Sequence, residues 1–302
     1  MAALSRLVAF LSLFGGPHSG IRITQEAAAR AHHNGSDARL QVVPRIIHQI
    51  FHDWKNPGNE KLPSDWEDVR QTCLSLNPGW DYKLWTEPAS REFLSREYPT
   101  FLKTYDGYRY PVQRVDALRY FLMLHYGGIY LDLDNGCSTS LEPLLYYPLW
   151  TTDGGRGTLS NNILGARPHH PFWEQLTQDL PRCAINYILP YLTISYASGQ
   201  WFLTEVWEKY HAALPAASRQ GDGDGDPRSQ HRLYQVMMDM RPGADPWVFF
   251  TQGRGGTWNN WDNYIFAWLG NLSQSIPVLM MLVLLPCALL SVLHETQSRV
   301  EA

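Results

Sequence analysis

The residues best suited to chemistry are two aspartates, Asp132 and Asp134, at the end of an apolar run over 129–133 that follows Gly127 and Gly128. In an extended strand, side chains two residues apart leave the same face, so this spacing predicts that both carboxylates project together. Mg²⁺ and Mn²⁺ prefer oxygen ligands and commonly take one or two carboxylates together with substrate phosphates. The pair indicates a metal and phosphate site, although a polar loop with two solvated acids is the alternative for Asp-x-Asp alone.

A helix is predicted just upstream, over 112–126, with Pro111 near its start and the paired glycines at its end. Asp116 and Arg119 are three residues apart and share one face, from which they could reach a sugar or phosphate at the end of the following strand. An intrahelical ion pair explains them equally well. The order of helix, Gly-Gly, apolar strand and Asp-x-Asp is more specific than any of its parts. The apolar stripe of the helix consists of Val115, Leu118 and Leu122.

This order, read over 113–119 and 127–134, resembles the glycosyltransferases with a DXD sugar-binding motif, the family of the Och1-type mannosyltransferases. Within that family the sequence is most similar to the fungal inositol phosphoceramide mannosyltransferases. The resemblance extends over about 42–270, and its supporting segments are 44–51, 82–85, 160–162 with 170–172, 198–203 and 255–258. It implies a GT-A fold, a Rossmann-like α/β sandwich that binds a nucleotide sugar and a divalent metal, Mn²⁺ or Mg²⁺, and transfers the sugar with retention of configuration.

The resemblance also implies roles for the first four candidates. Asp134 would be the principal metal ligand, while Asp132 would contact the donor sugar or ribose and reach the metal through water. Asp116 and Arg119 would hold the sugar hydroxyls and the diphosphate. The metal would stabilise the departing nucleoside diphosphate. The sequence shows no nucleophile, so both a double displacement and a same-face mechanism remain open.

A segment near the C-terminus departs from the family pattern. Related enzymes carry His-x-x-Gly-Ser-Ser-Trp-His, whereas Gln252 and Asn259 stand at the two histidine positions here. Their amide oxygens are acceptable ligands for a hard cation, and Arg254 adds a positive charge for phosphate. Either the altered motif still works, or the chain is a weakened or inactive member of the family.

Four further residues are candidates for substrate binding. His48 and Phe51, in the predicted first strand, could line a nucleotide-base pocket, although a core histidine beside an aromatic ring is the alternative. Asn161 and Trp258 lie in segments that carry the resemblance, and we expect them to contact substrate.

The pattern of short β-rich runs and helical stretches independently favours an α/β fold. The predicted strands are 45–51, 82–85 and 129–133, and the predicted helices are 64–76, 90–98, 112–126 and 171–179. In an open α/β sheet, ligands bind at the carboxyl ends of the strands, which is where the aspartate pair falls.

Composition agrees with one catalytic domain, predicted at 41–270. The chain has 302 residues, of which 44% are hydrophobic, so it can bury a sizeable core. A net charge of −4 gives no basic footprint and excludes nucleic acid as an expected partner. The Gly-Asp repeat within 214–232 lacks the Glu that closes an EF-hand loop, which favours a flexible insertion.

Both ends of the chain point to a membrane of the secretory pathway. Residues 276–293 carry no charge and are long enough to span a bilayer, so a transmembrane helix is predicted over 275–293, with a tail over 294–302; a buried core helix is the alternative. Residues 1–40 fit a signal peptide or degenerate signal anchor plus a stem. Among Cys73, Cys137 and Cys183, at most one disulfide can form. These features predict a single-pass protein of the Golgi or endoplasmic reticulum membrane, with a luminal catalytic domain.

Three functions follow from these expectations. The first is transfer of mannose from GDP-mannose to inositol phosphoceramide, a membrane lipid, with a regulatory subunit as a further partner. The second is an Och1-type mannosyltransferase that acts on protein-linked glycans. The third is a non-catalytic subunit that binds a sugar nucleotide, which the changes at Gln252 and Asn259 permit.

Overall fold

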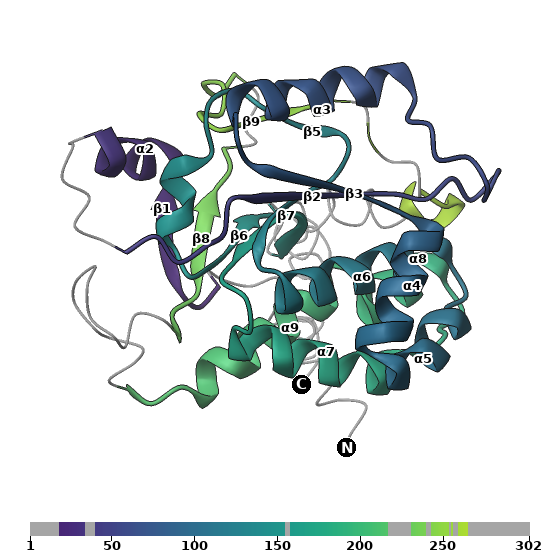
Figure 1. Ribbon diagram of the computed structural model, residues 1–302. Helices are drawn as coiled ribbons and strands as arrows, with labels where there is room; N and C mark the ends of the chain where they lie inside the picture. The colour runs from purple at the N-terminus through teal and green to yellow at the C-terminus, as the bar shows by residue number, and fades with distance from the viewer. Residues whose placement is uncertain are drawn as a thin grey trace, which may run out of the picture. The chain divides into compact units, whose positions relative to one another are not determined.

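The computed structural model describes residues 18–33, 40–154, 158–216, 231–239, 243–253, 255 and 259–264. The chain divides into two compact units, one comprising 1–188 and 192–256 and the other 189–191 and 257–302. The first unit is built around a seven-stranded sheet with the strand order β1-β8-β6-β7-β4-β2-β3 (Figure 1). The predicted α/β class is therefore confirmed.

The main sheet is mostly parallel. Strand β7 is the exception, because it runs antiparallel to both of its neighbours, β4 and β6. The strands of this sheet are β1 (Ile21–Thr24), β2 (Ile46–Phe51), β3 (Asp81–Thr86), β4 (Gly128–Leu131), β6 (Leu149–Asp153), β7 (Leu159–Ala166) and β8 (Tyr234–Met237). A second, two-stranded sheet pairs β5 (Asn135–Cys137) with β9 (Phe250–Gln252).

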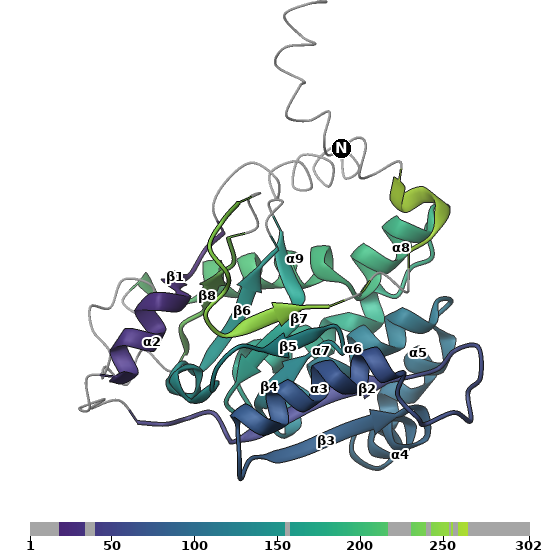
Figure 2. The same cartoon turned by 90° about the horizontal axis from the view of Figure 1, so that it is seen from above.

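Helices cover both faces of the main sheet. Helix α3 and the small β5–β9 sheet lie on one face, and α4 to α7 with α9 lie on the other (Figures 1 and 2). The helices are α2 (Gln25–His33), α3 (Ser64–Leu76), α4 (Glu87–Glu97), α5 (Leu102–Gly107), α6 (Pro111–His125), α7 (Pro171–Cys183), α8 (Pro190–Ala197) and α9 (Gln200–Ala213), with 3-10 turns η1 (Pro99–Phe101) and η2 (Glu142–Tyr146). The predicted helix 64–76 coincides with α3, whereas α4 begins before the predicted 90–98 and α7 continues beyond 179.

Strand β4 separates two hydrophobic cores because its side chains alternate between the faces of the sheet. Ile129 and Leu131 pack into the core on the side of α3, and Tyr130 packs into the core on the side of α6. The predicted stripe of α6 is confirmed, since Leu118 and Leu122 are fully buried. Almost the whole of α6 is enclosed, so its polar residues are enclosed with it.

Two glycines make the passage from α6 to β4. Gly127 and Gly128 have φ angles of 63° and 86°, in the region that residues with a side chain rarely adopt. A Cβ at Gly127 would lie 2.6 Å from the carbonyl oxygen of Ala166, and one at Gly128 would lie 2.7 Å from that of Ile46. The predicted Gly-Gly helix end therefore has both a conformational and a steric cause.

The prediction of a strand over 129–133 is wrong at its end. Strand β4 stops at Leu131, and the chain then makes a turn in which the Asn135 amide donates to the Asp132 carbonyl oxygen at 2.9 Å. Among the described residues, the last backbone hydrogen bond to β7 is the one from the Asp132 amide to the Asn162 carbonyl oxygen, at 2.8 Å. Beyond it the chain leaves the main sheet, because the following residues pair with β9 as strand β5. The aspartate pair thus lies on a turn, not on one face of a strand.

Within the described ranges, no helix is both long and apolar enough to cross a membrane. The predicted transmembrane helix 275–293 and the tail 294–302 lie outside those ranges. So do residues 1–17 of the predicted signal segment and 217–230 of the predicted insertion.

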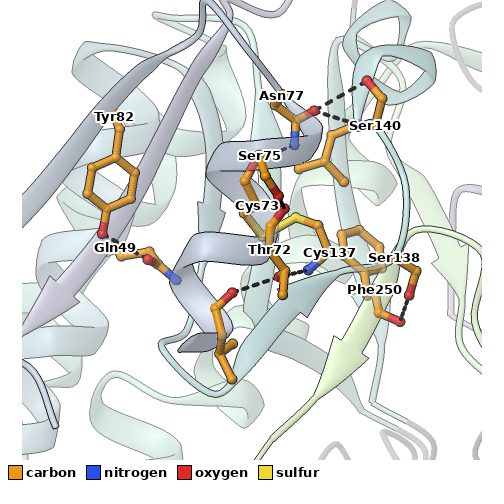
Figure 3. The surroundings of a disulfide bond; sticks show 12 residues. Gln49, Thr72, Cys73, Ser75, Asn77, Tyr82, Cys137, Ser138, Ser140 and Phe250 are labelled. Carbon is orange, nitrogen blue, oxygen red and sulfur yellow. Dashed lines mark hydrogen bonds between the residues drawn. A yellow bond between two sulfur atoms is a disulfide. The ribbon is translucent and has the colours of Figure 1, made fainter. Parts of the chain in front are cut away.

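One disulfide ties α3 to the chain that follows the aspartate pair (Figure 3). It joins Cys73 to Cys137 with their Cα atoms 4.8 Å apart, while Cys183 is free. The hydroxyl oxygen of Thr72 accepts the Cys137 amide at 2.9 Å, and the Asn77 side chain donates to the Cys73 carbonyl oxygen at 2.9 Å. The disulfide and these hydrogen bonds hold β5 against α3.

Replacing Cys73 and Cys137 together by serine is expected to lower the free energy of unfolding by about 2–5 kcal/mol, because the cross-link no longer restricts the unfolded chain. Denaturant unfolding of the oxidised protein measures the loss. Cys183→Ser is the matched control, and an equal effect of both changes would show that the disulfide contributes nothing.

Candidate functional site

A buried arginine joins helix α6 to the turn that carries the aspartate pair. The Arg119 guanidinium lies 3.3 Å from Oδ1 of Asp116 and 3.2 Å from Oδ1 of Asp132. Its Nη1 also donates to the Asn161 carbonyl oxygen in β7 at 2.6 Å. Four residues predicted from the sequence therefore meet at one point, and the ion pair within α6 extends to the aspartate motif.

Burial and charge act against each other in this cluster. Burial raises the pKa of Asp116, while the Arg119 charge and a hydrogen bond from Ser198 oppose the rise. Burial alone would lower the pKa of Arg119, but the negative charges of Asp132 and Asp116 outweigh it and raise that pKa. Arg119 is therefore a fixed positive charge in a water-poor setting, where charges interact strongly.

Both carboxylate oxygens of Asp116 accept hydrogen bonds from the protein. The Asn161 side-chain amide donates to Oδ1 at 2.9 Å, and the Ser198 hydroxyl donates to Oδ2 at 3.0 Å. The Tyr120 hydroxyl completes the network by donating to the Ser198 carbonyl oxygen at 2.8 Å, and it accepts from the Asn161 side chain at 3.1 Å. Asp116, on helix α6, is thus anchored by strand β7 and by the residue that follows helix α8.

One side of the Asp132 carboxylate is engaged as well. The Tyr130 hydroxyl donates to Oδ1 at 2.5 Å, the same oxygen that faces Arg119. The Arg119 guanidinium carbon lies 4.7 Å from the centre of the Tyr130 ring, within range of a cation–π contact. Tyr130 and Arg119 together orient Asp132, whose side chain remains 31% exposed.

The surroundings of the Asp134 side chain disfavour its negatively charged form. Burial, and then the negative charge of Asp132, raise the pKa of Asp134 to about 6, and Arg119 offsets this only weakly. The segment after β9 lies against Asp134, because the Gly253 amide donates to its carbonyl oxygen at 2.6 Å. A cation placed here would relieve the repulsion between the two carboxylates, so the site fits a divalent metal.

Of the remaining candidate residues, only some lie near the aspartate turn in the described structure. Gln252 ends β9 opposite Asn135, the residue after Asp134, so it lies next to the turn. Asn259 belongs to the second unit, and Arg254 and Trp258 lie outside the described residues. In the part of the chain that the structure describes, no three or more His, Cys, Asp or Glu side chains are arranged so that together they could hold a metal ion. The candidate metal ligands that the structure describes at this turn are therefore two carboxylates, Asp132 and Asp134, and the neighbouring amide of Gln252.

His48 and Phe51 lie in the core. His48 Nε2 is 3.0 Å from the Gly127 carbonyl oxygen, and its Nδ1 accepts from Trp85 Nε1 at 3.1 Å. Burial lowers the pKa of His48 to about 3, so the ring is neutral. These contacts match the alternative of a core histidine. Phe51 is buried at the end of β2 with its ring edge-on to Trp66 at 6.2 Å.

Sequence reasoning did not identify Tyr130, Tyr120 and Ser198 as parts of the site. Ser198 lies in a segment that supported the resemblance, which was the available signal for it. Tyr130 lies within 127–134, which also carried the resemblance, but both Tyr130 and Tyr120 fit the apolar patterns of a strand and a helix and so are interpreted as core aromatics.

A glycine close to Asp134 offers a sharp test of the site. A Cβ on Gly255 would lie 1.9 Å from Asp134 Oδ2, so Gly255→Ala must displace that carboxylate. We expect metal affinity to fall at least about tenfold, as when a metal ligand loses its orientation, with little change in melting temperature. Calorimetric titration with Mn²⁺ measures the affinity. Gly58→Ala, where a Cβ meets nothing within 4 Å, should leave it unchanged; equal affinities in both variants would contradict this placement.

Metal affinity should also depend on pH, because a carboxylate binds a cation only when deprotonated. The pKa of Asp134 is raised to about 6, so binding should be nearly independent of pH above 7 and weaken by about tenfold per unit well below 6. Mn²⁺ titrations between pH 5 and 8 measure this profile, and a profile that is flat down to pH 5 would exclude Asp134 as a ligand.

Comparison with known proteins identifies the family of the chain that carries this site. Residues 63–150 match the family described as "Glycosyltransferase sugar-binding region containing DXD motif". The chain is 38% identical to inositol phosphoceramide mannosyltransferase 2 of Schizosaccharomyces pombe, over 75% of this chain and 61% of that protein. It is 35% identical to inositol phosphoceramide mannosyltransferase 3 of the same yeast, over 87% of this chain and 70% of that protein.

Two further comparisons cover a smaller share of this chain. Mannosyl phosphorylinositol ceramide synthase SUR1 of Saccharomyces cerevisiae is 40% identical over 56% of this chain and 43% of that protein. Among solved structures, the PaToxG glycosyltransferase aligns with 64% of this chain and 79% of that chain, with a TM-score of 0.44 and 13% identity. The chain thus spans between 43% and 70% of the length of the three yeast relatives. It belongs to the family of DXD-motif glycosyltransferases that includes the inositol phosphoceramide mannosyltransferases.

Proposed function

We propose that this chain transfers a mannosyl residue from GDP-mannose to inositol phosphoceramide, with retention of configuration, in sphingolipid biosynthesis. The observation that carries the proposal is the junction of Asp116, Arg119 and Asp132 beside Asp134, because it sets two carboxylates and a fixed cation at one point of the fold. The names of the yeast relatives supply the donor sugar and the lipid acceptor of the proposal.

The position of this junction supports a GT-A arrangement. The aspartate turn follows the carboxyl end of β4, which is parallel to β2 in the main sheet, and β2 is parallel to β3. Open α/β sheets bind ligands at this edge. The antiparallel strand β7 delivers Asn161 to the same place, and α6 delivers Asp116 and Arg119. Three separate elements therefore converge where a nucleotide sugar would lie.

The residues of the site have distinct proposed roles. Asp134 and Asp132, with Gln252 nearby, would hold a divalent cation, Mn²⁺ or Mg²⁺, which when bound supplies charge neutralisation to the departing diphosphate. Arg119 contributes a second positive charge and fixes Asp132 through Oδ1. Asp116 and Asn161 hold Arg119 in place, so the charges are positioned before the donor binds.

The proposal includes a membrane setting. A span over 275–293 would keep the enzyme and its lipid acceptor on one surface, in the Golgi or endoplasmic reticulum, with the catalytic unit in the lumen. The Cys73–Cys137 disulfide supports an oxidising compartment. A regulatory subunit is a further proposed partner.

An acceptor comparison tests the proposed function. Membranes that contain the chain are supplied with labelled GDP-mannose and either inositol phosphoceramide or a mannose-rich glycan linked to protein. The proposal predicts labelled lipid and no labelled glycan. Labelled glycan alone would favour an Och1-type activity, and donor binding without any product would identify a non-catalytic subunit.

A further inference from the structure

Three large apolar side chains are exposed within four consecutive residues between α7 and α8. Ile188 is 96% exposed, Ile185 48% and Tyr187 37%. We call residues 184–188 the apolar loop. The other exposed large hydrophobic residues that the structure describes in the first unit, Leu40 and Leu76, are isolated in the sequence. Single exposed apolar residues need no explanation, whereas a contiguous group marks an interaction surface.

The apolar loop is held in a defined conformation. The Tyr187 amide donates to the Thr193 hydroxyl oxygen at 2.9 Å, and that hydroxyl donates to the Tyr187 carbonyl oxygen at 3.1 Å. Thr193 is fully buried in α8, and the Tyr187 ring lies 5.8 Å from that of Tyr196. The exposed side chains therefore project from an anchored segment.

Helix α8 links this loop to the candidate site. Thr193 fixes the loop, and five residues later Ser198 donates to Asp116 Oδ2 at 3.0 Å. At the helical rise, five residues span about 7.5 Å. One short element therefore holds the apolar loop at one end and part of the sugar site at the other.

The chemistry of the loop fits a lipid surface. The sequence has no charged residue from 183 to 204. The two isoleucine side chains of the loop are wholly apolar, and the tyrosine has an apolar ring with a polar hydroxyl at its tip, which suits the membrane interface. Arg182, whose side chain is 84% exposed, precedes the loop and could meet lipid phosphate.

We propose that the apolar loop inserts into the surface of the lipid bilayer and seats the catalytic unit where a lipid acceptor presents its headgroup. The inference rests on the proposed function for the identity of the acceptor, and on the loop alone for the contact with lipid. Residues 184–188 would thus help the enzyme reach its lipid acceptor and would take no part in binding the sugar nucleotide.

Depth-dependent fluorescence tests the lipid contact without using activity. The full chain, with Cys183→Ser and Cys287→Ser, receives an Ile188→Cys substitution that is labelled with an environment-sensitive fluorophore in nanodiscs of phosphatidylcholine and phosphatidylinositol. Lys61→Cys, at an exposed polar position, is the matched control. We expect the label at position 188 to be quenched by doxyl lipid and protected from iodide, and the label at position 61 to show the reverse.

Two outcomes would overturn the proposal. Iodide quenching at position 188 as strong as at position 61 would place the loop in water. Protection from both quenchers would mean that protein covers the loop, either residues 265–302 of this chain or a partner subunit.

Kinetics then separate this inference from the proposed function. Ile188→Asp should raise the KM for inositol phosphoceramide in vesicles by about tenfold, because a charged side chain is excluded from the lipid, and leave the KM for GDP-mannose unchanged. Leu40→Asp, the same kind of change at another exposed residue, should alter neither. Unchanged lipid KM in Ile188→Asp would overturn the docking role. Absence of transfer by the unaltered chain, with lipid quenching retained at position 188, would instead defeat the proposed function alone.

Discussion

Replacing Asp134 by alanine is expected to reduce mannosyl transfer at least about a thousandfold while the protein stays folded. A bound divalent cation is worth several kcal/mol of stabilisation to a departing diphosphate, and each 1.36 kcal/mol is a factor of ten in rate. The fold should tolerate the change, because burial and Asp132 already disfavour the Asp134 carboxylate and raise its pKa to about 6. Initial rates with saturating donor, together with thermal unfolding of the purified variant, measure both effects.

The control for this variant is Asp68→Asn, which alters an exposed carboxyl group of α3 and should keep full activity. If Asp134→Ala retained more than a tenth of the activity, the assignment of Asp134 as the principal metal ligand would be lost. If it instead unfolded, the loss of activity would carry no information about the metal.

The second large effect is expected for Arg119→Met. Removing one member of a buried charge cluster leaves its partners uncompensated, which typically costs about 3–5 kcal/mol. Here the partners are Asp116 and Asp132, and methionine restores neither the charge nor the hydrogen bond to the Asn161 carbonyl oxygen. We expect the unfolding free energy to fall by that amount and transfer to be abolished. Arg119→Lys should also lose most activity, because one ammonium group lacks the planar fork that reaches all three acceptors.

Arg114 provides the matched comparison on the same helix. It pairs with Glu87 at 3.4 Å in a more exposed position, and such pairs contribute at most about 1 kcal/mol. Arg114→Met should therefore cost at most that amount. Equal losses in the two variants would show that the junction of Asp116, Arg119 and Asp132 has no special importance for stability.

The sequence contained enough information to place the centre of the site. The Gly-Gly end of α6 and the apolar alternation of β4 locate Asp132, and the helical spacing places Asp116 and Arg119 on one face of α6. The sequence did not show which residues outside α6 the Arg119 side chain contacts. Arg119 turns to Asp132 and Asn161 because β7 lies beside β4, and that pairing joins residues more than thirty positions apart.

The turn at Asp132 was mispredicted for a related reason. An apolar alternation predicts a strand for as long as it lasts, and Leu133 continues it. Leu133 is indeed buried, but in a turn that leads from the main sheet into the small β5–β9 sheet. Where a strand leaves its sheet depends on its neighbours, which a local pattern does not contain.

The half of the sheet that includes β1, β6 and β8 was not predicted. Strand β1 has four residues, and it pairs with β8 through Ile21 opposite Tyr234. Such short strands carry too few side chains for an alternation to stand out, and their partners are distant in the chain. Helix α8 is similarly short and apolar, so Ser198 at its end could be recognised only through the resemblance.

The metal dependence of lipid mannosylation is the decisive measurement for a divalent-metal site at Asp132 and Asp134. Membranes that contain the chain receive labelled GDP-mannose and inositol phosphoceramide, first with EDTA and then with Mn²⁺ restored in excess, and the labelled lipid is counted. We expect no labelled lipid with EDTA, full recovery with Mn²⁺, and no recovery in Asp134→Ala. Labelled lipid formed at an undiminished rate in EDTA would contradict a metal site at Asp132 and Asp134.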